Sequence, residues 1–317
     1  MEENSIVRKN MRFVKDYNLP INIFNEEMFS YYRELYKDFW PYEAEKQMNK
    51  EISAFSGNID KWLESYANLR DRIIETLENS EEYKEFNTCD LHMYDIPDLG
   101  IGEHNLYNQE NDNKFFLSVD LKKANFQALK YVDVILDNTY EDFIMSFYGG
   151  TKYFADSKYL RQVIFGKLNP KRQIKVEKYL MAELYRYLTY YYSEYLPTLY
   201  SFNSDELVFS IKNDTNVLTY KQIKEIEKDI SVIFGIDVRV ELVKINRIPI
   251  VNSNGATVDA YIRKNVYTNE ETLKKASTTF FPQIYKIYKG MEINELDKKF
   301  FFEGQIATFD NELKLNK

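Results

Sequence analysis

Residues 198–211 read TLYSFNSDELVFSI, two short runs of β-prone residues on either side of Asn203-Ser204-Asp205. Two such runs around a tight polar turn predict a β-hairpin. Residues 219–242 follow, TYKQIKEIEKDISVIFGIDVRVEL, and begin with Thr219 and Gln222 at the spacing of a capping box. Isoleucines then recur at helical spacing, and after Gly235 apolar residues alternate with charged ones, as in a half-buried strand. This part of the chain therefore predicts a hairpin, a helix and a strand, in that order.

The preceding segment extends the pattern toward the N-terminus. Residues 115–119, FFLSV, form a β-prone run that ends at Asp120, and apolar residues from Phe126 onward recur at helical spacing. Residues 172–195 predict a second, long helix. Residues 114–245 thus predict an α+β fold, in which helices back one face of an antiparallel sheet. Residues 1 to about 86 are predicted to be helical.

The expected organisation has three parts. Residues 1–112 form a helical N-terminal region, which ends in the polar run NQENDN. Residues 113–262 form the α+β core, into which a basic helical segment, 152–195, is inserted. Residues 263–317 are expected to be a helical region flanking the core.

Composition narrows the class of protein. The chain has 317 residues, a net charge of −8, two histidines and one cysteine, so no intrachain disulfide can form. Cys89, His92 and His104 supply only three ligands for zinc, whereas a structural site needs four. No run of about 18 apolar residues and no secretory signal is present, so we expect no membrane partner and a cytoplasmic location. Abundant Asn, Lys and Ile suit an A+T-rich genome, and for a viral protein the location would be the host cytoplasm.

The sequence places carboxylates at the ends of predicted strands. Asp120 ends the first strand, and Asp205 with Glu206 lies at the hairpin turn. If the first strand lies beside the hairpin, Asp120 and Asp205 project at one edge of the sheet. Carboxylates there would hold two Mg²⁺ (or Mn²⁺) ions, with Asp120 and Asp205 as ligands. Two such ions clamp the attacking and leaving oxygens of a phosphoryl transfer.

These residues carry a resemblance to known polymerases. SDELVF (204–209) resembles motif C of family A DNA polymerases, His-Asp-Glu-Leu-Val-Phe, and VDLKKANF (119–126) is similar to motif A of palm-domain polymerases. RQVIFG (161–166), between the two, resembles the Lys-x-x-Asn-Phe-Gly of the family A fingers helix. The resemblance implies a palm-domain nucleotidyltransferase.

The resemblance also implies roles for single residues. Asp120 and Asp205 would bind metal, and Glu206 would be a supporting catalytic carboxylate. Arg161 would face the incoming triphosphate, and Asn125 stands where such enzymes commonly screen the sugar 2′ position.

A basic segment lies between the two carboxylate positions. Residues 152–186 contain nine Lys and Arg residues and three acidic ones, within an acidic chain. We expect Lys158 and Lys167, with Arg161, to contact nucleotide phosphates, and interleaved tyrosines to stack on bases. The expected partners are a nucleoside triphosphate and a nucleic acid, DNA or RNA. A protein partner remains possible.

Two other functions stay open at this point. The chain could be a non-enzymatic viral or mobile-element protein that binds a protein or nucleic acid through the same layer. The Ser-Asp-Glu triplet at 204–206 also resembles the tRNA-His guanylyltransferase family, which shares the palm fold. The sequence does not choose between template types, between sugars, or between primed and unprimed synthesis.

Overall fold

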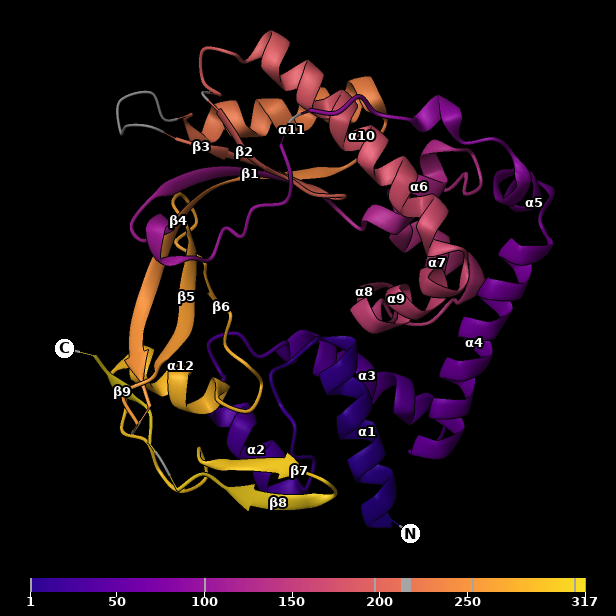
Figure 1. The fold of residues 1–317 in the computed structure, drawn as a ribbon. Helices are drawn as coiled ribbons and strands as arrows, with labels where there is room; N and C mark the ends of the chain where they lie inside the picture. The colour runs from indigo at the N-terminus through magenta and orange to yellow at the C-terminus, as the bar shows by residue number, and fades with distance from the viewer. Residues whose placement is uncertain are drawn as a thin grey trace.

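The computed structural model describes residues 2–99, 101–196, 198–211, 218–252, 254–310 and 312–316. These residues form an α+β fold, as the sequence predicts, with a helical N-terminal region and an antiparallel sheet of seven strands. In Figure 1 the sheet runs along the top and left of the molecule, helices form the right side, and helices together with a small two-stranded sheet form the base.

The N-terminal region is helical, which confirms the prediction for residues 1–86. Asn25, Asn58 and Ser80 cap three of its helices, because each side chain accepts a hydrogen bond from a backbone N–H in the first turn. The helices are α1 (Glu2–Asp16), α2 (Glu26–Leu35), α3 (Tyr42–Ala54), α4 (Ile59–Asn79) and α5 (Glu81–Thr88). Two short 3₁₀ helices follow, η1 (His92–Tyr94) and η2 (Gln109–Asn111).

The sheet has the order β2-β3-β1-β4-β5-β6, and β9 pairs with the far end of β4. Its strands are β1 (Phe115–Leu121), β2 (Thr198–Phe202), β3 (Glu206–Ser210), β4 (Val238–Val251), β5 (Thr257–Asn265), β6 (Glu271–Lys274) and β9 (Lys314–Leu315). The predicted hairpin is present as β2 and β3. The strand predicted after Gly235 is also present, but it continues well beyond Leu242 and links the central layer to the C-terminal part of the chain.

The two faces of β1 have different surroundings. Leu117, Val119 and Leu121 belong to the main hydrophobic core, whereas Phe116 belongs to a small second cluster on the opposite face. Because side chains alternate along a strand, Ser118 and Asp120 share the face of Phe116. Figure 1 shows α10 and α11 packed on one face of β1–β3. Ser118 and Asp120 lie on the opposite face of the sheet.

In Figure 1 the helices between β1 and β2 lie at the upper right, inside α4 and α5, and α10 extends across the top. They are α6 (Ala124–Tyr131), α7 (Tyr140–Phe147), α8 (Tyr153–Asp156), α9 (Lys158–Lys167) and α10 (Pro170–Tyr191). The long helix predicted over 172–195 is α10. The predicted capping box begins α11 (Tyr220–Phe234), where Thr219 and Gln222 exchange hydrogen bonds, and Gly235 ends the helix with a φ of 66°.

Residues 263–317 differ from the helical region that the sequence predicts. Apart from the end of β5, the described part contains one helix, α12 (Phe281–Lys289), together with β6, β9 and the hairpin of β7 (Lys299–Phe302) and β8 (Gln305–Thr308). A small apolar cluster joins α12 to the outer halves of β4 and β5 through Ile284, Ile250 and Ile262. Strand pairing with β4, rather than a helical bundle, therefore organises this end of the chain.

The largest buried cluster crosses the expected boundary at residue 112. It contains Trp62 and Tyr66 of α4 together with Phe154 of α8 and Leu160 of α9. The N-terminal helices and the helices that follow β1 therefore share one core. No helix in the described part of the chain combines the length and the apolar character needed to cross a membrane.

Candidate active site

The pairing of β1 with β3 brings the predicted carboxylates together. Asp120 lies directly opposite Glu206 in this antiparallel pair. The backbone N–H of Leu121 donates to the carbonyl oxygen of Asp205 at 2.8 Å, so Asp205 lies at the same end of β1. The condition stated for the site, that the first strand lies beside the hairpin, is met.

Arginines from the next two strands reach this carboxylate cluster, which we define as Asp120, Asp205 and Glu206. Arg239 of β4 donates from Nη2 to Oδ2 of Asp120 at 3.0 Å. Arg263 of β5 lies 3.4 Å from Oε1 of Glu206, and the hydroxyl of Ser118 donates to that same oxygen at 2.5 Å. Asp120 and Glu206 therefore lie in a charged layer on the face of the sheet opposite α10 and α11, and Asp205 lies beside them at the turn of the hairpin.

The electrostatics of the cluster favour proton or cation uptake. Burial raises the pKa of Asp120 to about 6, and the negative charges of Glu206 and Asp205 add to this rise while Arg239 opposes it. The pKa of Asp205 is also raised, by loss of water contacts and by the charge of Glu206, although its side chain at the hairpin tip remains exposed. Carboxylates that repel each other in this way gain stability when a positive charge joins them.

A fourth carboxylate, not assigned a role from the sequence, is affected by the charge of the cluster. Glu177 of α10 is only 3% exposed, and its pKa is raised to about 7 by burial and by the charge of Asp205. Asn125 donates from Nδ2 to Oε1 of Glu177 at 2.9 Å, so Asn125 supports this carboxylate in the structure. The sequence held a signal for Glu177, because it interrupts an apolar helical stripe that continues through Leu180 and Leu184.

Two cations that have no ion pair among the described residues lie at the start of α6 and on α9. Arg161 and Lys123 both lie over the ring of Tyr140, at 5.8 Å and 4.8 Å from its centroid. Burial lowers the pKa of both side chains, and the charge of Arg161 lowers that of Lys123 further. Neither forms an ion pair with any residue that the structure describes. Arg161 thus lies in a cation-rich environment, and Lys123 is a second candidate that the sequence analysis did not single out.

Lys158 and Lys167 lie at opposite ends of α9, and both are exposed. They are nine positions apart, which corresponds to about 13.5 Å along the helix axis and about half a turn around it. Lys158 is near β6, since its charge contributes to the lowered pKa of Lys274, which is due first to burial and then to Arg263. Lys274 therefore adds a cation beside the cluster. No contact of the Lys167 side chain links it to the carboxylates.

The carboxylates are suitable in type for Mg²⁺ or Mn²⁺, which prefer oxygen ligands. Asp120, Asp205 and Glu206 are the residues that would hold such ions, and the charge of Asp205 also reaches Glu177. In the part of the chain that the structure describes, no three His, Cys, Asp or Glu side chains are arranged as a ready-made metal site. The oxygens of Asp120 and Glu206 instead face Arg239, Arg263 and Ser118.

The three potential zinc ligands have separate partners. Cys89 contacts Arg172, His92 pairs with Asp95, and the His104 ring lies against Tyr200. They form no common site in the structure.

Comparisons with protein-family models, with curated proteins and with solved structures find no match to this chain. Any functional conclusion therefore depends on the geometry and charge of the site itself.

Proposed function

We propose that the protein is a palm-type nucleotidyltransferase that adds nucleotides to a nucleic-acid 3′ end. The observation that carries this proposal is the pairing of Asp120 with Glu206, which brings Asp205 to the same edge of the sheet. Palm-domain enzymes place their metal-binding carboxylates on a strand and on the adjacent hairpin, and the resemblance of residues 119–126 and 204–209 concerns these same positions.

The bound ions would supply charge neutralisation and orientation for an in-line phosphoryl transfer. Asp120 and Asp205 would hold them, and Glu206 would fix the site through its contacts with Ser118 and Arg263. Arg161 and Lys123 provide unpaired positive charge suited to a triphosphate.

The test is incorporation of labelled NTPs and dNTPs with Mg²⁺ or Mn²⁺, on primed DNA, on primed RNA and without template. We expect incorporation by the natural protein, its loss in Asp205→Asn, and its retention in Asp310→Asn. Asp310 is a suitable control because it is an exposed aspartate outside the cluster. Addition of GTP at a 5′ end would identify a guanylyltransferase instead.

A second candidate function is binding without catalysis. Arg239 and Arg263 already neutralise Asp120 and Glu206 in the absence of metal, as in a purely structural ion-pair network. A folded protein with no incorporation under any condition, and no change in melting temperature with Mg²⁺, would favour this candidate.

A further inference from the structure

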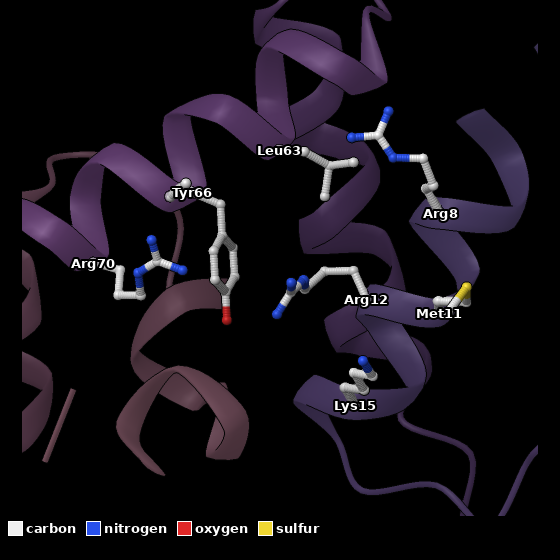
Figure 2. A pocket seen from close by; sticks show the side chains of 8 residues that line it. Arg8, Met11, Arg12, Lys15, Leu63, Tyr66 and Arg70 are labelled. Atoms are coloured by element: carbon white, nitrogen blue, oxygen red, sulfur yellow. The ribbon is translucent and has the colours of Figure 1, made fainter. Parts of the chain in front are cut away.

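A second cationic site lies in a hollow between α1 and α4, away from the carboxylate cluster. Its volume is about 280 Å³, close to the lower limit of about 300 Å³ for small-molecule pockets. Figure 2 shows the side chains around it, which come from both helices. The lining residues are Arg8, Met11, Arg12, Lys15, Leu63, Tyr66, Ala67 and Arg70.

Arg12 at this hollow has unused hydrogen-bond donors. Its guanidinium group lies over the rings of Tyr66 and Tyr159, at 4.6 Å and 4.7 Å from their centroids. Its Nε and Nη1 atoms are buried and have no hydrogen-bond partner among the described residues. Buried guanidinium nitrogens without an acceptor are costly, and an anionic oxygen is the acceptor that they bind best.

The nearest buried carboxylate does not meet this need. Asp16 accepts hydrogen bonds from the hydroxyls of Tyr66, Tyr153 and Ser157 at 2.7–2.8 Å. Its oxygens are thus occupied by hydroxyl groups that connect α1 to α4 and to the start of α9. Arg12 lies beside this network, and its buried Nε and Nη1 atoms find no acceptor there among the described residues.

The other cations leave the hollow with an excess of positive charge. Arg8 pairs with Asp60, and Arg70 pairs with its neighbour Asp71. These pairs are exposed, and such pairs are weak enough to exchange partners. Lys15 is exposed and has no ion pair in the described chain, and its ammonium group lies over the Tyr159 ring, 5.9 Å from the centroid.

The arrangement of the cations fits a strand rather than a single small anion. Arg8, Arg12 and Lys15 recur every three or four residues, so they lie along one face of α1 over about 10 Å. A nucleic-acid strand in a duplex carries one phosphate per about 3.4 Å of axis, so this row can meet more than one phosphate. We propose that the hollow between α1 and α4 binds backbone phosphates of a nucleic-acid strand, with Arg12 as its central donor.

The position of α9 connects this hollow to the candidate active site. Tyr159 of α9 contacts Arg12, and two residues later Arg161 faces Tyr140 beside Lys123. One short helix therefore contributes to both places. A strand held at the hollow would be anchored to the element that carries Arg161, but binding there requires neither metal nor nucleotidyl transfer.

The proposal is tested by fluorescence anisotropy with labelled single-stranded DNA and RNA, about 12 nucleotides long and with a 5′-hydroxyl, in EDTA. We expect Arg12→Gln and Lys15→Gln each to weaken binding about tenfold and to reduce the slope of affinity against salt by about one. Lys61→Gln, which removes an exposed charge from α4 outside the hollow, should bind as the natural protein does. Because Lys15 is exposed, its variant tests the site even if Arg12→Gln does not fold.

Further binding experiments distinguish backbone phosphates from a terminal phosphate, inorganic phosphate and free triphosphate. Equal binding of oligonucleotides with a 5′-hydroxyl and a 5′-phosphate is expected for backbone contacts. The proposal is overturned if Lys15→Gln and a folded Arg12→Gln bind the strand with normal affinity. It is also overturned if these variants bind inorganic phosphate or free triphosphate more weakly but bind the strand normally. Because no metal or nucleotide is added, an inactive protein that binds normally would contradict the proposed function alone.

Discussion

Arg239 donates a hydrogen bond from Nη2 to the carboxylate of Asp120 at 3.0 Å, from the position directly opposite in the neighbouring strand. Asp120 is one of the two residues that we propose as metal ligands. The arginine supplies in the metal-free protein part of the positive charge that a divalent ion would supply. Arginine and metal should therefore compete for Asp120.

Arg239→Gln should make Mg²⁺ binding tighter. Removing one positive charge about 4 Å from a divalent ion is worth about 2 kcal/mol at the dielectric constant of bulk water, equivalent to about a thirtyfold lower Mg²⁺ concentration at half-saturation. The measurement is the melting temperature as a function of Mg²⁺ concentration. Lys228→Gln is the control, since Lys228 is an exposed lysine on α11, behind the opposite face of the sheet. Unchanged or weaker Mg²⁺ binding in Arg239→Gln would contradict competition at Asp120.

Glu177 should make the stability of the metal-free protein depend on pH. Its folded-state pKa is raised to about 7 by burial and by Asp205, so the folded protein holds this proton more tightly than the unfolded chain. The resulting stability is fully present below about pH 4.5 and is lost as the pH rises through about 7. The loss is roughly 3 kcal/mol at full ionisation.

Glu177→Gln removes this titration, so the variant should become more stable relative to the natural protein as the pH rises from 5 to 8. Urea unfolding at several pH values in EDTA measures the difference. Glu64→Gln, a substitution at an exposed position on α4, should leave the pH profile unchanged. Parallel profiles for Glu177→Gln and the natural protein would show that this carboxyl does not titrate abnormally.

Thr219→Ala should destabilise the protein by about 1 kcal/mol, because it removes one half of a capping box. The Thr219 hydroxyl accepts from the N–H of Gln222 at 3.3 Å, and the Gln222 side chain accepts from the N–H of Thr219 at 2.8 Å. Urea unfolding measures the change. Thr219→Ser keeps the hydroxyl and should be close to neutral, and an equal loss in both variants would argue against the cap as the cause.

The capping box also shows which features the sequence could predict. Its partners are three residues apart, and Gly235 ends the same helix, so both signals are local. The hairpin of β2 and β3 was predictable for the same reason. The sequence also contained a local signal for the hairpin of β7 and β8, because Glu303-Gly304 separates two β-prone runs. In the structure both turn residues have positive φ. That signal was missed in the sequence analysis.

Contacts between distant segments were not predictable in this way. Asp120 and Glu206 were identified from their residue types, but their pairing depends on β1 inserting between β3 and β4, which no local pattern specifies. Arg263 reaches Glu206 from a strand 57 residues further along the chain. The apolar stripe of α10 marked Glu177 as unusual, but only the packing of α10 near the hairpin shows that the charge of Asp205 raises its pKa.

Arg161→Gln should weaken binding of a nucleoside triphosphate about tenfold, which corresponds to the loss of one charge-assisted hydrogen bond of about 1.4 kcal/mol. The reason is that Arg161 and Lys123 form no ion pair in the described structure and repel each other beside Tyr140, so an anionic ligand would relieve their repulsion. Equilibrium titration with a fluorescent triphosphate measures the effect whether or not incorporation occurs. Arg161→Lys keeps the charge and should restore part of the affinity.

Lys167→Gln is the matched control, because Lys167 lies on the same helix and none of its contacts reaches the described carboxylate cluster. If Lys167→Gln weakened triphosphate binding as much as Arg161→Gln, the cause would be a general effect of charge on α9 and not a specific role of Arg161.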